Sequence, residues 1–281
     1  MVDFWNVDWI TRSPLFAPLR EVASGLPHVG WPDTEVLNAL ADGCGRRIVN
    51  ANGQLIRFVV QDAKPAHFEE MFEPRAFLRG EVLVRRFNWH DLFNALVWMT
   101  FPTAKASLNA RNYTALCARS AGQRSPEGDA LTLFDENGVV ALSSDRELLE
   151  LLREFRWKPL FWERREAVRR RMRFLAFGHA LFEKALKPYV GMTGKAIVFE
   201  VSETITSLEH RALLAEVDRL SALYIWDREH LSCGRTLAPL PVLGIPGWWK
   251  DNEDEGFYDN ADYFRPGRSR APRQPPTSSI A

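Results

Sequence analysis

The sequence is poor in cysteine, and the cysteines that it has lie far apart. Cys44, Cys117 and Cys233 are odd in number and show no Cys-x-x-Cys spacing. Structural disulfides usually come from even sets of cysteines, and zinc knuckles and redox motifs use closely spaced pairs. Neither a disulfide framework nor a zinc knuckle is therefore expected.

The chain also lacks net charge and long hydrophobic runs. Its Lys+Arg count of 36 equals its Asp+Glu count of 36, so no overall field favours nucleic acid or an anionic membrane. The most apolar stretch, LFNALVWMTFP, ends at Pro102, well before the roughly 18 residues of a membrane span. The N-terminus lacks the basic and apolar segments of a secretory signal. We expect no membrane insertion, no nucleic-acid partner and a cytoplasmic location.

Common catalytic signatures are missing as well. The sequence contains no GxSxG, HExxH or GxGxxG pattern. The segment GMTGKA at 191–196 has neither the spacing nor the hydroxyl residue of a phosphate-binding loop. Any chemistry must therefore rest on other residues.

The remaining composition predicts a globular protein. The chain has 281 residues, of which 46% are hydrophobic and 26% charged, enough for one large core or two modest ones. We predict one α+β domain over 1–268, mostly helical, with a small antiparallel sheet. The predicted core helices are 89–117, broken at Pro102, and 161–187. The predicted strands are 54–61, 81–87, 131–142 and 195–201.

Local signals refine three of these regions. Segment 131–142 is predicted to be a hairpin, because Asn137-Gly138 suits a type I′ turn. A helix is predicted over about 144–155, with Ser144 or Asp145 as its N-cap. The segment 239–266 is rich in proline and aromatic residues, so we expect an irregular arm packed on the body and a candidate lid over the site. The tail 269–281 is expected to be disordered.

Two pairs of polar residues lie within apolar segments. His90 and Asn94 occur in NWHDLFNALVWMTF, and His179 and Glu183 occur in FGHALFEKAL. Residues four apart share one helix face, and buried polar groups cost roughly 1–3 kcal/mol each unless they find partners. We therefore expect the two pairs to face a common polar pocket.

These residue types suit acid–base chemistry or metal binding. A histidine and a carboxylate one turn apart can bind a divalent metal, or the carboxylate can orient the imidazole as a base. Asp135 would complete a set of two histidines and a carboxylate, as used for Fe, Mn or Zn. The predicted catalytic residues are His90, Asn94, Asp135, His179 and Glu183, with His90, His179 and Glu183 as candidate metal ligands. Alternatively, the histidines are core residues that hydrogen-bond to their neighbours, and Asp135 is a turn residue that bonds to its own backbone.

A dense run of arginines lies at 164–173. Arginine prefers carboxylate or phosphate partners, so the run is either a solvated face paired with acids of this chain or a contact for an anionic partner. The zero net charge favours pairing within the chain. The arginines are Arg164, Arg165, Arg169, Arg170, Arg171 and Arg173.

Several long motifs, in this order, resemble the bacterial family of proteins of unknown function designated DUF3025. They are FNWHDLFNALVWMTFPTAKASLNAR, DALTLFDENGVV, FGHALFEKALKPYVGMTGKA, PLPVLGIPGWW and FYDNADYFRP. The resemblance runs from about Trp5 to Arg268 and implies a bacterial, cytoplasmic protein, with no fold or activity attached. The polar positions of the family's motifs correspond to His90, Asp91, Asn94, Asn109, Asp129, Asp135, Glu136, His179 and Glu183.

Two functions remain open from the sequence. The first is a hydrolase-like enzyme, with or without a divalent metal, that acts on a small-molecule or anionic substrate. There His90 and His179 serve as ligands or general base, Glu183 orients a histidine or binds metal, and Asn94 donates its amide to substrate. The second is a non-catalytic binding or assembly protein in which these residues form a buried structural network.

Overall fold

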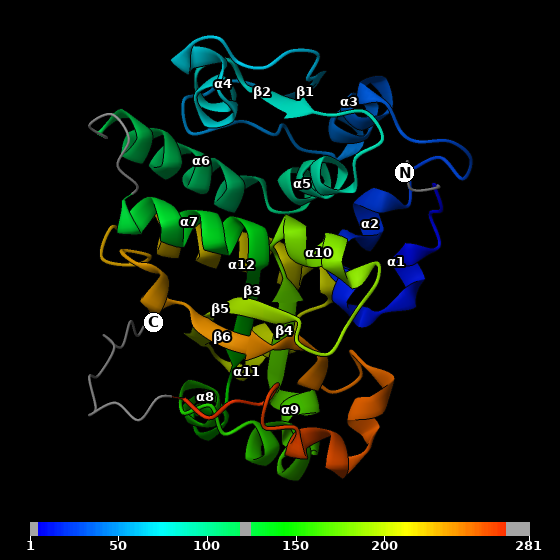
Figure 1. The fold of residues 1–281 in the computed structure, drawn as a ribbon, viewed down its shortest axis with the longest axis vertical. Helices are drawn as coiled ribbons and strands as arrows, with labels where there is room; N and C mark the ends of the chain where they lie inside the picture. The colour runs from blue at the N-terminus through cyan, green and yellow to red at the C-terminus, as the bar shows by residue number, and fades with distance from the viewer. Residues whose placement is uncertain (1–4, 119–124, 268–281) are drawn as a thin grey trace.

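The computed structural model describes residues 5–118 and 125–267, which form one mostly helical α+β domain, as predicted. A small two-stranded sheet lies at one end of the molecule and a four-stranded sheet at its middle, with a layer of helices between them (Figure 1). The predicted single antiparallel sheet is therefore wrong, since there are two sheets and both contain parallel pairs.

The N-terminal segment consists of short helical turns. Its prolines prevent long helices, yet Trp9 and Phe16 are almost fully buried and contact Phe93 of the next layer. The segment thus closes one side of the core. It comprises α1 (Trp9–Arg12), η1 (Pro14–Leu19) and α2 (Arg20–Ala23).

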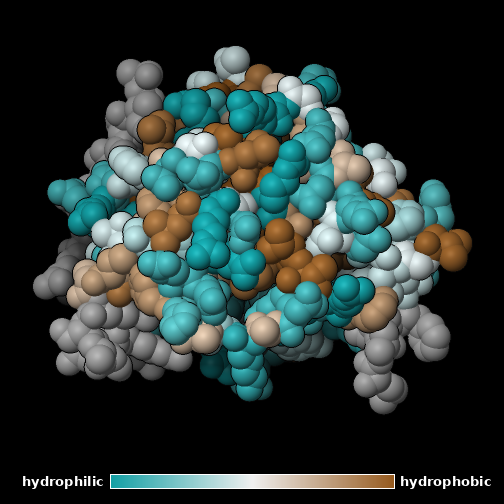
Figure 2. All heavy atoms as spheres, turned by 90° about the horizontal axis from the view of Figure 1, so that it is seen from above, coloured by the Kyte–Doolittle hydropathy of each residue, from teal (hydrophilic) through white to brown (hydrophobic). Residues whose placement is uncertain are grey.

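The small sheet forms a parallel pair because a helix returns the chain to its starting end. Strand β1 (Arg57–Val60) pairs in parallel with β2 (Glu81–Val84), and η2 (Phe68–Glu70) and α4 (Phe72–Arg79) lie between them in the chain. Parallel neighbours need such a crossover. Helix α3 (Thr34–Gly43), capped by Asp33 as its sequence suggests, packs beside β1. Seen from this end, the surface mixes hydrophilic and hydrophobic side chains (Figure 2).

The predicted helix 89–117 is present and broken at the predicted place. Helix α5 (Trp89–Thr100) begins at Asn88, whose side chain accepts a hydrogen bond from the Asp91 backbone N–H at 3.0 Å. Phe101 then leaves helical geometry, and α6 (Pro102–Cys117) starts with proline at its first position, where the missing N–H costs nothing. Almost every residue of α5 is buried.

The predicted hairpin at 131–142 is wrong in its first half. Residues Pro126–Asn137 form helix α7, and only Gly138–Ser143 form a strand, β3. Ser125 caps α7 by accepting a hydrogen bond from the Gly128 N–H, with Pro126 in the first turn. This helix start signal outweighs the turn preference of Asn137-Gly138.

The predicted helix 161–187 is also wrong, because it is interrupted by a strand. The chain forms a π-helical turn (Pro159–Glu163), α9 (Arg165–Arg171), strand β4 (Met172–Ala176) and α10 (His179–Ala185). Strand β4 pairs antiparallel with β3 along its whole length. The main-chain bonds and the buried face that β3 offers override the helical preference of this segment.

The four-stranded sheet has the order β4-β3-β5-β6. Strand β5 (Thr193–Glu200), predicted from the sequence, runs parallel to β3 and antiparallel to β6 (Ala238–Pro241). Helix α8 (Arg146–Arg153), capped by Asp145 as expected, α11 (Glu203–Thr206) and α12 (His210–Trp226) complete the helical cover. None of the helices in the described ranges is both long and apolar enough to cross a membrane.

The C-terminal arm packs on the body, as expected, although β6 gives it one strand. Tyr258, Tyr263 and Phe264 are buried, and the Tyr263 hydroxyl donates to the Met192 carbonyl at 2.7 Å. Beyond β6 the arm runs beside β4, α8 and α9 to the end of the molecule opposite α5 (Figure 1). The lid prediction is therefore wrong. The tail 269–281 lies outside the described residues. The turn η4 (Gly234–Thr236) precedes β6, and the arm continues through η5 (Val242–Gly244), η6 (Lys250–Glu253) and η7 (Glu255–Asp259).

The arginine run pairs mainly with acids of the same chain. Arg165 is buried and bonds to Glu253 and to the Asn252 carbonyl of the arm. The other ion pairs of the run are Arg164 with Glu147, Arg169 with Glu166 and Glu253, and Arg171 with Asp145. The prediction of pairing within the chain is confirmed for these four arginines.

Candidate functional site

The two predicted polar pairs meet where the start of α5 faces the start of α10. The Nε2 atoms of His90 and His179 are 3.0 Å apart, and the two rings are nearly perpendicular, at 82°. The Nδ1 atom of His90 lies 3.0 Å from Oε2 of Glu183. The predicted meeting of the two helices is confirmed for His90, His179 and Glu183, whereas Asn94 bonds to Lys105 and neither of the two described surface hollows is lined by these residues.

Two glycines allow this arrangement. A Cβ on Gly178 would lie 2.3 Å from the Glu136 carbonyl oxygen, and one on Gly138 would lie 2.4 Å from the Phe134 carbonyl oxygen. The N–H groups of Phe177 and Gly178 both donate to the Gly138 carbonyl at 2.9 Å. The start of α10 therefore lies directly against the end of α7, which brings His179 beside Asp135.

When both rings are in a neutral tautomer, their contacts allow one set of proton positions. A carboxylate only accepts, so Nδ1 of His90 carries the proton toward Glu183 and its Nε2 has a lone pair. Nε2 of His179 must then donate to that lone pair, which leaves Nδ1 of His179 without a proton. That atom is buried without a hydrogen-bond partner and lies 3.8 Å from Oδ2 of Asp135.

Burial lowers the pKa of His179 to about 3, assisted by the nearby charge of Lys105 and by His90 and opposed by Asp135. His179 is thus neutral at physiological pH. Its side chain is 8% exposed, whereas that of His90 is 31% exposed. The pair joins a buried neutral ring to a ring that reaches the solvent.

A buried lysine, which the sequence reasoning missed, lies behind the histidines. Nζ of Lys105, on α6, donates to Oδ1 of Asp135 at 2.5 Å and to Oδ1 of Asn94 at 2.9 Å. It also lies 5.5 Å from the ring centroid of Trp98. Burial raises the pKa of Asp135. The charge and hydrogen bond of Lys105 and the proximity of His179 together lower it by more, so the net shift of the Asp135 pKa is downward. Asn94 therefore binds a lysine and is itself buried.

A second missed carboxylate extends the network along α6. Oε2 of Glu73, on α4, accepts from the Asn109 amide at 2.6 Å, and Oε1 accepts from Asn112 at 3.3 Å. Burial and the charge of Asp135 raise the pKa of Glu73 to about 7, although Lys105 and the two amides oppose this. The sequence places Lys105, Asn109 and Asn112 on one face of α6, but neither the burial of Lys105 nor the contact with Glu73 could be read from that spacing.

The other polar positions of the family motifs have separate surroundings. The Asp91 carboxylate accepts hydrogen bonds from three groups of Arg85, its backbone N–H, Nε and Nη2, at 2.7–2.8 Å. These bonds hold the chain in place before α5. Asp129 is exposed and Glu136 is partly exposed on α7. In the described part of the chain, neither side chain forms a hydrogen bond or an ion pair with the two histidines, so neither is assigned to the site.

The three predicted metal ligands do not surround one point. Glu183 faces Nδ1 of His90, on the side of the ring opposite the Nε2 atom that faces His179. Within residues 5–118 and 125–267, no group of three or more His, Cys, Asp or Glu is placed to hold a metal ion. The prediction of His90, His179 and Glu183 as a three-ligand site is therefore wrong.

The family model described as "Protein of unknown function (DUF3025)" matches residues 56–268. The chain belongs to the DUF3025 family. The match of this DUF3025 protein begins at Ile56, so the N-terminal turns and α3, which the sequence resemblance included, lie outside it. No curated protein and no solved structure matches the chain. Everything in the histidine network lies within the matched residues.

Proposed function

We propose that this DUF3025 protein is an enzyme of hydrolytic type that uses His90 as a general base. The observation that carries the proposal is the meeting of the two Nε2 atoms, at 3.0 Å, with Glu183 bonded to the opposite side of the His90 ring. A carboxylate on Nδ1 fixes the tautomer and stabilises the imidazolium when Nε2 takes a proton.

The two rings offer complementary groups to one oxygen atom. A water or hydroxyl between them would give its proton to Nε2 of His90 and accept a hydrogen bond from Nε2–H of His179. Because the pKa of His179 is about 3, this ring donates as a neutral group. The rings must separate to admit the oxygen, and His90 is the more exposed of the two.

The buried charges behind the rings hold His179 in place. Asp135 lies beside its Nδ1, and Lys105 neutralises that carboxylate. Buried ion pairs seldom add net stability compared with apolar residues of the same size. Clustered groups with shifted pKa values are typical of functional sites, which supports a role beyond packing.

A second candidate function is the non-catalytic one, in which the network only stabilises the helix layer. Two observations favour it. The direct bond between the histidines fills the position that a substrate oxygen would occupy. Neither of the two surface hollows described for this molecule is lined by a residue of the network.

Hydrolysis of small activated substrates separates the two functions. With p-nitrophenyl acetate and p-nitrophenyl phosphate as probes, His90→Gln should reduce any activity by about 10²–10⁴-fold, the usual contribution of a general base. The matched control is His28→Gln, an exposed histidine with no hydrogen bond in the described part of the chain, and it should retain activity. A metal chelator should leave the rate unchanged, since only two imidazoles face one point.

The structural alternative predicts a different result. In that case the wild type and His90→Gln hydrolyse the probes equally slowly, while the thermal melt of His90→Gln shifts downward through loss of a hydrogen bond worth about 1 kcal/mol. That combination would refute the catalytic proposal.

A further inference from the structure

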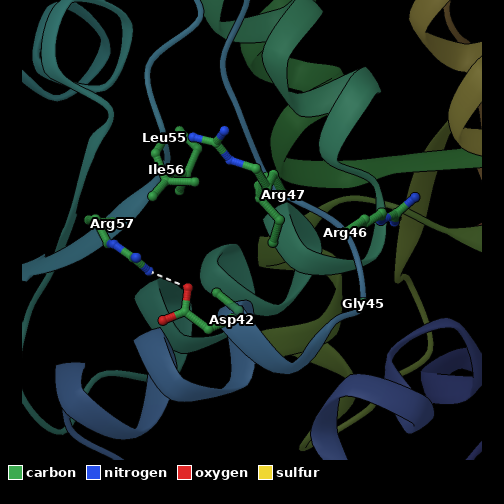
Figure 3. A pocket seen from close by; sticks show the side chains of 9 residues that line it. Asp42, Gly45, Arg46, Arg47, Leu55, Ile56 and Arg57 are labelled. Carbon is green, nitrogen blue, oxygen red and sulfur yellow. Dashed lines mark hydrogen bonds and ion pairs between the residues drawn. The ribbon is translucent and has the colours of Figure 1, made fainter.

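A pocket lies at the other end of α5, away from the histidines. It has a volume of about 400 Å³ and is lined by Ala41 and Asp42 of α3 and by residues 45–48 and 55–57. This volume falls within the roughly 300–1,000 Å³ of small-molecule sites. Figure 3 shows the side chains that form its wall and rim.

The chain builds the pocket with a turn and a bridge. After α3, Gly45 adopts a positive φ of 70°, where a Cβ would meet nothing within 4 Å. The chain then runs outward and returns, and the Ile56 N–H donates to the Ile48 carbonyl at 2.9 Å. Ile48 and Ile56 are both buried, so the lining has an apolar part that joins the core.

The charged rim is mainly cationic and only partly paired. Arg57 bonds to Asp42 at 2.6 Å, and their side chains are 40% and 61% exposed. Arg47 forms no hydrogen bond or ion pair with any described residue, and its side chain extends beside Leu55 (Figure 3). The lining thus holds more guanidinium than carboxylate.

Arg46 has a different role from its two neighbours. Its Nη2 donates to the carbonyls of Met99 and Thr100 at the end of α5, at 3.3 and 3.0 Å. In Figure 3 its side chain points away from Asp42 and Arg57. Arg46 therefore anchors the turn to α5, and Arg47 and Arg57 are the groups left for a ligand.

We propose that this pocket binds a small organic anion, with a phosphate or carboxylate group on an apolar body. Arg47 would bind the anionic group, and Arg57 would join it by exchanging Asp42 for the ligand. Exposed ion pairs contribute little to stability, so Arg57 can exchange Asp42 for the ligand at small cost. The apolar part of the ligand would lie against Leu55.

The pocket is independent of the histidine site. His90 is in the first turn of α5, whereas Met99 and Thr100 are at its end, roughly 15 Å away at 1.5 Å per residue. A failure of the hydrolase proposal would leave the anion site untouched, and the reverse also holds.

Calorimetric titration of the full chain with phenyl phosphate and with benzoate tests the proposal. Arg47→Gln should weaken binding about tenfold or more, because it removes the charge-assisted bonds to the anionic group. Asp42→Asn should tighten binding, because it frees Arg57 and removes the carboxylate of the rim. The matched control Arg153→Gln, an exposed arginine on α8, should bind like the wild type.

The probes also separate the two kinds of anionic group. Tighter binding of phenyl phosphate assigns the site to phosphate esters, and tighter binding of benzoate assigns it to carboxylates. Either result supports the proposal if added salt weakens binding. Absence of saturable binding, equal affinity for benzyl alcohol, or identical affinities of wild type, Arg47→Gln and Asp42→Asn would overturn it. Arg47 is exposed, so its variant should keep the fold.

Discussion

The charge of the buried Lys105 can be removed with little change in volume by the Lys105→Met substitution. The Lys105 side chain is 3% exposed and that of its partner Asp135 is 11% exposed. Methionine keeps the apolar stem that packs near Trp98 but leaves the carboxylate without its cation. Breaking a buried ion pair in this way costs about 3–5 kcal/mol, a large part of a typical folding free energy of about 5–15 kcal/mol.

The loss should depend on pH, and its sign follows from Asp135. In the wild type the pKa of Asp135 is lowered. Its contribution to the stability of the fold is therefore fully present above the ordinary pKa of 3.8 and is lost as pH falls through the folded-state pKa. In Lys105→Met, the positive charge that opposed the effect of burial is absent, so the pKa of Asp135 rises. An acid with a raised folded pKa loses stability as pH rises. The variant should therefore be weakened more at about pH 8 than at about pH 5.

Urea unfolding followed by tryptophan fluorescence at both pH values measures this loss. The double variant Lys105→Met/Asp135→Asn should recover much of it, because no buried charge then remains. Lys184→Met is the matched control, since Lys184 is exposed on α10, and it should stay within about 0.5 kcal/mol of the wild type. A loss for Lys105→Met that is equally small, or the same at both pH values, would show that the charges are not buried as described.

Two other substitutions probe the surroundings of the network. The folded-state pKa of Glu73 is raised from 4.5 to about 7, so the stability that Glu73 contributes should be lost as pH rises between those values. Glu73→Gln should flatten this part of the stability–pH curve. A curve parallel to that of the wild type would contradict the shift. Gly178→Ala would place a Cβ 2.3 Å from the Glu136 carbonyl oxygen and should cost about 1–3 kcal/mol through strain, lowering the melting temperature. Gly43→Ala, with nothing within 4 Å of its Cβ, is the matched control, and equal melts for the two variants would be inconsistent with the close contact at Gly178.

The sequence predicted the meeting of His90 with His179 because local spacing carried the necessary information. Each histidine has a polar partner four residues away in an otherwise apolar helix, and apolar helices of one core must pack together. The same reasoning assigned Asn94 to the substrate, but its partner is Lys105. A lysine usually keeps its charged end in water, so its burial could not be read from the sequence.

The errors in the fold come from segments whose local preference is weaker than their tertiary surroundings. Asn137-Gly138 looks like a turn, yet Gly138 has an extended backbone and begins β3. There glycine is needed for close packing against Phe134. Residues 172–176 follow an arginine-rich helix and become a strand only because β3 offers them a partner. Pairing across the chain does not show in a single local pattern.

Gly138 begins β3 and Gly178 follows β4, so the histidine site forms only when these two strands pair in the correct register. Val139 of β3 pairs with Ala176 of β4, Asp135 lies in the last turn of α7 just before β3, and His179 begins α10 just after β4. A slip of one residue would move the two helices about 3.3 Å relative to one another and turn the strand over. His179 would then leave both Asp135 and His90. A chain whose strands pair in the wrong register during folding therefore lacks the histidine site. The pKa of His179 is lowered only once the sheet is correctly paired.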